Sequence, residues 1–150
     1  MKFLLVISII LLSASAYDSF WQKGDSLLTE LQNGKDEIFI ISFYNPSPIK
    51  DDYTRQNFNN KIMDELQSSI LNKYHGEPLS IRYSSIDSTD RDNDTLLYKA
   101  GIHSNKLEKG PVILITRKGN GHTVWGPTII QKVEDFVKKL QESARDSLNQ

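Results

Sequence analysis

The side chains that most often carry chemistry are either missing from this chain of 150 residues or scattered along it. The chain has no cysteine, which excludes thiol catalysis, disulfide bonds and thiolate metal sites. Its three histidines, His75, His103 and His122, fall in separate segments and form no His-x-x-x-His pair. We therefore predict surface histidines rather than a metal site, and we predict no cofactor.

Three other local patterns have polar groups but no catalytic arrangement. The acidic run at residues 87–94 lacks the central glycine and terminal glutamate of a calcium loop, so we predict a solvated loop. Ser47 has no neighbouring base that could activate it as a nucleophile. The sequence Gly119-Asn120-Gly121 predicts a hairpin turn rather than a phosphate cradle, because no helix follows it directly. The residues therefore predict no active site.

The charge balance narrows the class of partner. The chain has 18 basic and 19 acidic side chains, for a formal net charge of -1. No basic excess is available for a phosphate backbone, so we predict no nucleic-acid partner and expect protein partners instead.

The N-terminal 17 residues differ from the rest of the chain. Lys2 precedes an apolar run at residues 3–12, and the small residues Ala14-Ser15-Ala16 follow it. This pattern is typical of a signal peptide cleaved before Tyr17. If residues 1–17 are retained, we expect an N-terminal hydrophobic helix that anchors the protein in a membrane. The anchor is the leading expectation, and aromatic and basic residues at Phe20, Trp21 and Lys23 would then lie at the membrane interface.

Periodicity and turn residues predict eight elements after the N-terminal segment. Residues 37–44 form a continuous β-branched and aromatic run, which is typical of a strand buried on both faces. Residues 53–74 have apolar side chains every four residues, which predicts a helix. The full set comprises helices at residues 25–33, 53–74, 95–100 and from about 128 to 141, and strands at residues 37–44, 79–86, 111–117 and 122–125.

This order predicts one α/β domain at residues 18–142, followed by a polar tail at residues 143–150 that we expect to fray. Strands that are separated by helices are expected to run parallel, whereas the last two strands, joined by the glycine turn, must run antiparallel. The prediction is a three-layer sandwich: a mixed sheet of about four strands with helices on both faces.

Short motifs in the same order resemble the thioredoxin-like superfamily, in particular domains of the protein disulfide isomerase type. The motifs are Phe43-Tyr44-Asn45-Pro46, Ile86-Asp87-Ser88-Thr89, Gly110-Pro111-Val112 and Trp125-Gly126. They resemble the family's Phe-Tyr-Ala-Pro, Val-Asp-Ala-Thr, cis-proline and Tyr-x-Gly segments. The resemblance places the family's two catalytic cysteines at Pro48 and Asp51, and its cis-proline at Pro111. It therefore implies a domain without thiol–disulfide activity, which is not an enzyme.

Tyr44 and Trp125 either complete the core of such a domain or contact a partner. The leading expectation is a redox-inactive interaction domain, anchored as an accessory subunit of a larger membrane complex. The domain would lie on the non-cytosolic side, for example in a respiratory-chain assembly of the mitochondrial inner membrane. The alternative is a secreted or lumenal peptide-binding protein of the endoplasmic reticulum. In the secretory lumen the sequon Asn93-Asp94-Thr95 would be a glycosylation site.

Overall fold

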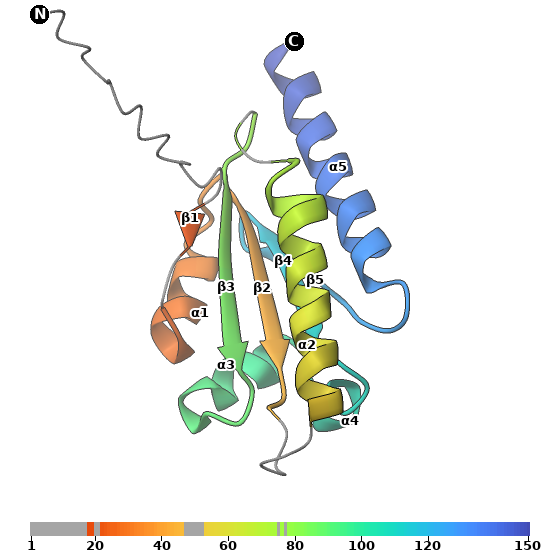
Figure 1. Ribbon diagram of the computed structural model, residues 1–150. Helices are drawn as coiled ribbons and strands as arrows, with labels where there is room; N and C mark the ends of the chain where they lie inside the picture. The colour runs from red at the N-terminus through yellow and green to blue at the C-terminus, as the bar shows by residue number, and fades with distance from the viewer. Residues whose placement is uncertain (1–17, 20–21, 47–52, 75, 77) are drawn as a thin grey trace, which may run out of the picture.

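The most apolar segments of the chain form the centre of a sheet. In the computed structural model, which describes residues 18–150 except 20–21, 47–52, 75 and 77, β2 (Ile38–Tyr44) lies between β3 (Ile81–Asp87) and β4 (Val112–Arg117). Six of the seven residues of β2 are buried. Helices cover both faces of this strand, which explains why its sequence is continuously apolar rather than alternating (Figure 1).

The sheet has five strands in the order β1-β3-β2-β4-β5. The edge strand β5 (Asn120–Val124) pairs antiparallel with β4 across the predicted glycine turn. The other edge, β1 (Asp18–Ser19), pairs parallel with β3. The prediction of a mixed sheet is confirmed, and β1 is an addition, because two polar residues have no periodicity that could identify a strand.

The direction of β4 differs from the prediction. β2 and β3 run parallel, as expected, but β4 runs antiparallel to β2, with Phe43 opposite Val112. The segment between β3 and β4 holds only a 3₁₀ turn, η2 (Arg91–Asn93), and the short helices α3 (Asp94–Lys99) and α4 (Ser104–Leu107). These elements do not carry the chain back along the whole sheet, so β4 starts at the end where β3 stops.

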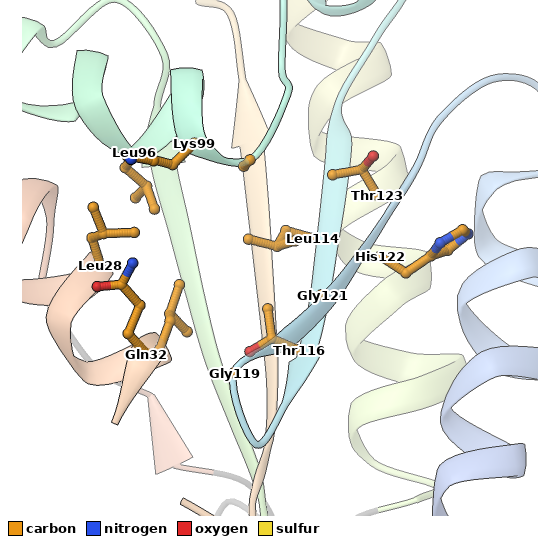
Figure 2. Close-up of a pocket in the computed structure, with 12 residues that line it drawn as sticks. Leu28, Gln32, Leu96, Lys99, Leu114, Thr116, Gly119, Gly121, His122 and Thr123 are labelled. Atoms are coloured by element: carbon orange, nitrogen blue, oxygen red, sulfur yellow. The ribbon is translucent and has the colours of Figure 1, made fainter. Parts of the chain in front are cut away.

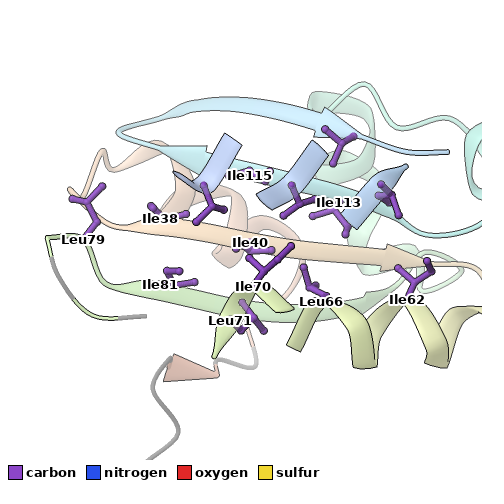
Figure 3. Packing of buried hydrophobic residues seen from close by; sticks show 14 of the residues in the cluster. Ile38, Ile40, Ile62, Leu66, Ile70, Leu71, Leu79, Ile81, Ile113 and Ile115 are labelled. Atoms are coloured by element: carbon purple, nitrogen blue, oxygen red, sulfur yellow. The ribbon is translucent and has the colours of Figure 1, made fainter. Parts of the chain in front are cut away.

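Two helices pack on one face of the sheet. They are α2 (Tyr53–Leu66), which continues into the π-helical turn η1 (Gln67–Leu71), and α5 (Ile129–Leu148). Figure 3 shows isoleucines of β2, β3 and β4 packed against apolar side chains of α2 and η1. Helix α1 (Gly24–Gln32) packs with α3 on the opposite face, over a second buried cluster. Helices therefore cover both faces, as predicted.

Two helical predictions are corrected. The predicted helix at residues 53–74 is α-helical only to Leu66 and then widens into the π turn. The expected frayed tail after Gln141 is instead the last part of α5, which continues to Leu148. Gln141 and Ala144 are both buried, so the helix keeps contact with the fold beyond its predicted end.

The expected N-terminal hydrophobic helix falls at residues 1–17, which lie outside the described residues. Within the described part of the chain, no helix is long and apolar enough to span a membrane.

Candidate binding site

Three of the residues singled out from the sequence lie at one end of the sheet. Tyr44 ends β2, Pro111 directly precedes β4, and Trp125 directly follows β5. The register brings them together, because Phe43 lies opposite Val112 and Ile113 lies opposite Val124. Helix α2 also begins at this end, with Tyr53. Tyr44, Pro111 and Trp125 therefore lie at the same end of the sheet.

The two positions assigned to the family's cysteines, Pro48 and Asp51, lie outside the described residues, in the segment between β2 and α2. Their assignment stays a prediction. Pro111 is buried. The cis form of the peptide bond before it also stays a prediction.

Trp125 is held at the surface by two lysines. Its side chain is 39% exposed, and the Lys106 ammonium lies 4.0 Å from the centroid of its ring. Lys106 also donates a hydrogen bond to the Gly101 carbonyl at 3.1 Å, which fixes the ammonium in place. The Lys132 ammonium donates to the Trp125 carbonyl at 3.3 Å. A tryptophan held in this way presents apolar area in a fixed orientation, flanked by positive charge.

Phe58 is one of the apolar residues that recur every four positions in the predicted helix at residues 53–74. The pattern placed it on the buried face, and this is wrong. Its side chain is 43% exposed and lies against the loop before Pro111. A Cβ atom added at Gly110 would lie 2.5 Å from Phe58 Cε1, and Gly110 has φ +134°. Glycine at this position therefore lets the aromatic ring rest directly on the backbone. A shallow hollow lies beside the ring, between the first turns of α2 and residues 108–110.

Tyr53, Phe58 and Trp125 together form what we call the aromatic end. Tyr53 is 64% exposed. Tyr44, half-buried beneath this surface, is not part of it: burial raises the pKa of its phenol, and the nearby Asp87 carboxylate adds to the effect. Tyr44 is therefore uncharged at neutral pH, and its hydroxyl can act as a hydrogen-bond donor.

The aromatic end offers contact area and positive charge, but its described residues include no group arranged for bond making. The chain has no thiol. Among the described residues, no cluster of three or more histidine or acidic side chains could hold a metal ion. His122 instead stacks on Phe136, with ring centroids 5.3 Å apart. Two acids of the predicted acidic loop, Asp90 and Asp92, form ion pairs with Lys23 at 2.6 and 2.9 Å.

Asn93 is an interior residue rather than an exposed acceptor for glycosylation. It is 1% exposed. Its Oδ1 accepts a hydrogen bond from the Gly24 amide at 2.9 Å, and its Nδ2 donates to the Asp87 carbonyl at 3.2 Å. A glycan is attached through Nδ2, so modification would require this buried nitrogen to leave its contact with the Asp87 carbonyl at the end of β3. The fold therefore argues against a glycan at Asn93.

Comparison with known proteins identifies the fold. No protein-family model and no curated protein matches the chain. Among solved structures, thioredoxin from Trypanosoma brucei brucei is similar, with 14% identity and a TM-score of 0.52 over 83% of this chain and 93% of that chain. Thioredoxin f from spinach chloroplast has 11% identity and a TM-score of 0.50, over 85% of this chain and 96% of that chain.

The chain therefore has a thioredoxin-like fold. It lacks the Cys-x-x-Cys motif, since it contains no cysteine.

Three residues of this surface were missed by the sequence analysis. Tyr53 was assigned only to a helix, and Phe58 was assigned to the buried face of that helix. Lys106 fell between the predicted elements, in a segment expected to be a loop, and it belongs to α4. Lys106 and Trp125 lie 19 positions apart, so no local spacing could have linked them. The exposure of Tyr53 could have been predicted from its place at the start of the helix, because the first turn of a helix that follows a buried strand is often open to solvent.

Proposed function

We propose that this chain is a redox-inactive, non-enzymatic thioredoxin-like protein that binds other proteins through the aromatic end. The observation that carries the proposal is the exposure of Tyr53, Phe58 and Trp125 at the end of the sheet where the resemblance places the family's cysteines. Large aromatic side chains contribute more than their share of binding energy in protein interfaces, particularly when they are held rigidly.

The binding partner in this proposal is a folded subunit of a membrane-associated complex, and residues 1–17 anchor the chain beside it. Fixed aromatic side chains suit a permanent contact, because little conformational entropy is lost when they are covered. An assembly of the respiratory-chain type in the mitochondrial inner membrane is the setting we favour.

The alternative is a secreted or lumenal protein of the endoplasmic reticulum that binds unfolded peptide. The pattern Ala14-Ser15-Ala16 favours it, because it fits the signal for cleavage before Tyr17. Mass spectrometry of the mature N-terminus separates the two forms of the proposal. A chain that starts at Met1 supports the anchor, and a chain that starts at Tyr17 supports export.

The size of the native complex tests the binding function itself. Full-length tagged protein, extracted in mild detergent from the cells that make it, should elute as an assembly larger than the monomer. Trp125→Ala and Phe58→Ala should shift it towards the monomer. Leu148→Ala is the control, because Leu148 is a large exposed apolar side chain near the end of α5. A wild-type protein that elutes as a monomer, or a control that dissociates as readily, would contradict the proposal.

A further inference from the structure

A second concave site lies on a different part of the molecule, over the face of the sheet that carries α1 and α3. It is a cleft of about 370 Å³ between these helices and the β4–β5 hairpin (Figure 2). This volume falls within the range of small-molecule sites. The cleft is separate from the aromatic end, because its lining residues include none of Tyr53, Phe58 and Trp125.

Gly121 keeps this cleft open. In the edge strand β5 it pairs with Thr116, and it has no side chain to cover that part of the sheet. A Cβ atom at Gly121 would lie 3.1 Å from both Leu114 Cδ1 and Thr116 Cγ2. Gly121 is not in the left-handed region, so backbone conformation does not require glycine here. The absence of a side chain at Gly121 therefore serves to leave the cleft unfilled.

The cleft has both polar and apolar walls, and the apolar part comes from leucines. Leucines from a helix on each side and from the sheet converge on it, and these are Leu28, Leu31, Leu96 and Leu114. Figure 2 shows the side chains of Leu28, Leu96 and Leu114 around the same space. Such a surface is suited to the apolar body of a ligand.

One buried polar atom in the cleft is unsatisfied. Thr116 is 5% exposed, and its Oγ1 has no hydrogen-bond partner within the described part of the structure. An unpaired buried hydroxyl is unfavourable, and it needs a reason. A rotation of χ1 by about 120° brings the hydroxyl to the position where the Cγ2 methyl now faces Gly121, and moves the methyl to the position of the Hβ atom. The hydroxyl can therefore reach an oxygen atom of a ligand in the cleft.

The rim of the cleft carries one positive charge. Among the described residues that line the cleft, Lys99 at the end of α3 is the single charged one, and it is exposed. It makes no ion pair with any described residue. His122 also belongs to the lining, but its ring points away from the cleft and stacks on Phe136. An anionic group is thus favoured at the Lys99 end, with no acidic lining residue to oppose it.

We propose that this cleft binds a small amphipathic carboxylate. The apolar or aromatic body lies on the leucines, the carboxylate lies beside Lys99, and a hydroxyl at the far end pairs with Thr116. The lysine and threonine lie on opposite sides of the leucines in Figure 2, so one elongated molecule can reach both.

The probes are phenylpropionate, its para-hydroxy derivative and the neutral amide of that derivative. Each is titrated into the ¹⁵N-labelled full-length protein and followed by amide chemical shifts. We expect saturable shifts confined to α1, α3 and the β4–β5 hairpin, with the hydroxy acid binding more tightly than both the plain acid and the amide. An absence of saturation at millimolar concentration, or shifts centred on Trp125, would overturn the proposal.

Substitutions on each side of the cleft assign the contacts. Lys99→Gln should lower the affinity for the two acids by up to about fivefold and leave the affinity for the amide unchanged. Lys139→Gln, at an exposed lysine of α5, is the control, and it should change the affinity for neither the acids nor the amide. Equal effects of these two variants would contradict a carboxylate at Lys99.

Thr116→Val keeps the shape of the side chain and removes its hydroxyl. We expect it to abolish the preference for the para-hydroxy acid, a loss of about three- to tenfold, without weakening the plain acid. Gly121→Val should reduce the affinity for all three probes, because it fills the cleft. If Thr116→Val retains the preference for the hydroxyl, the proposed contact is wrong, whatever the fate of Gly121→Val.

Discussion

Gln141 is a polar side chain in the interior, and it joins helix α5 to the turn between η1 and β3. Its Oε1 accepts a hydrogen bond from the Leu79 amide at 3.0 Å. Its Nε2 donates to the carbonyls of Tyr74 and Leu79, at 3.0 and 2.9 Å. One amide thus satisfies three buried or half-buried backbone groups, which a hydrocarbon side chain could not do.

We expect Gln141→Ala to lower the free energy of unfolding by about 1–3 kcal/mol, because the Leu79 amide and carbonyl lose their partner. Gln131→Ala, at an exposed position of the same helix, should change it little. Urea denaturation of the two variants makes the comparison. Equal stabilities would show that the amide contacts of Gln141 do not stabilise the fold.

Glu30 links α1 to β3 through Arg82, and its side chain is 12% exposed. Burial alone would raise the pKa of this carboxyl, but hydrogen bonds from Arg82 and Lys35 outweigh it and hold the pKa below 4.5. A depressed folded-state pKa gives stability that is present above the unfolded pKa and is lost as the pH falls through the folded value.

Glu30→Gln should therefore unfold with a weaker dependence on pH than the wild type between neutral pH and about pH 3. Urea midpoints measured across this range give the dependence. Glu142→Gln, at an exposed position of α5, serves as the control and should keep the wild-type slope. An unchanged slope in Glu30→Gln would show that this carboxyl does not contribute to acid denaturation.

Helix α2, on the face of the sheet opposite α1, combines two helical geometries. α2 changes at Gln67 into one π-helical turn, which holds one more residue than an α-helical turn. The turn buries both Ile70 and Leu71 beside Leu66. In a continuous α-helix, an extra residue at this point would rotate the following side chains by about 100° and move one of them out of the core.

Deletion of the exposed residue Ser69 should therefore convert the π turn into α-helix and preserve the fold, since Leu66 and the two apolar residues then take i, i+3 and i+4 spacing. Deletion of Asn60 should be far more disruptive, because it turns the preceding residues off the sheet and breaks the hydrogen bond from Asn59 to the Asn45 carbonyl. Thermal unfolding followed by circular dichroism compares the two. Equal losses would contradict this account of the turn.

The junction between β2 and α2 tests the assignment of Pro48 and Asp51. Cysteine residues at the two positions should form an intramolecular disulfide under mild oxidation, because the family's cysteines have Cα atoms about 5.5 Å apart. The variant is Pro48→Cys with Asp51→Cys, and Pro48→Cys alone is the control. Free-thiol titration of the folded variants measures the bond, and two free thiols in the folded double variant would refute the assignment.

Much of this architecture could be predicted from the sequence, and the exceptions have physical causes. The strands β2 and β4 were predicted within one residue because both are dense runs of β-branched residues. Local pattern could not predict β1 or the direction of β4, since both depend on pairing between distant segments. Of the three residues of the aromatic end, Trp125 was singled out through a motif. The exposure of Phe58 depends on Gly110, which lies 52 positions away.

At the scale of the whole molecule, the chain combines a thioredoxin-like fold with a complete absence of thiols. The helices and the sheet position three exposed aromatic side chains, those of the aromatic end, at one end of the molecule. The cysteine thiols that react in thioredoxins are absent from the chain. This arrangement cannot exchange disulfides with a partner, because it has no thiol. We propose instead that it binds a partner through the aromatic end.

Site-specific photo-crosslinking of the full-length protein in its own cells tests this claim most directly. A photoreactive phenylalanine analogue is placed at Trp125 or Phe58, and in the control at Asn120, which is exposed at the opposite end of β5. We predict discrete covalent adducts of the same partner from Trp125 and Phe58, and none from Asn120. Adducts from Asn120 alone, or no adduct from either aromatic position, would contradict the claim.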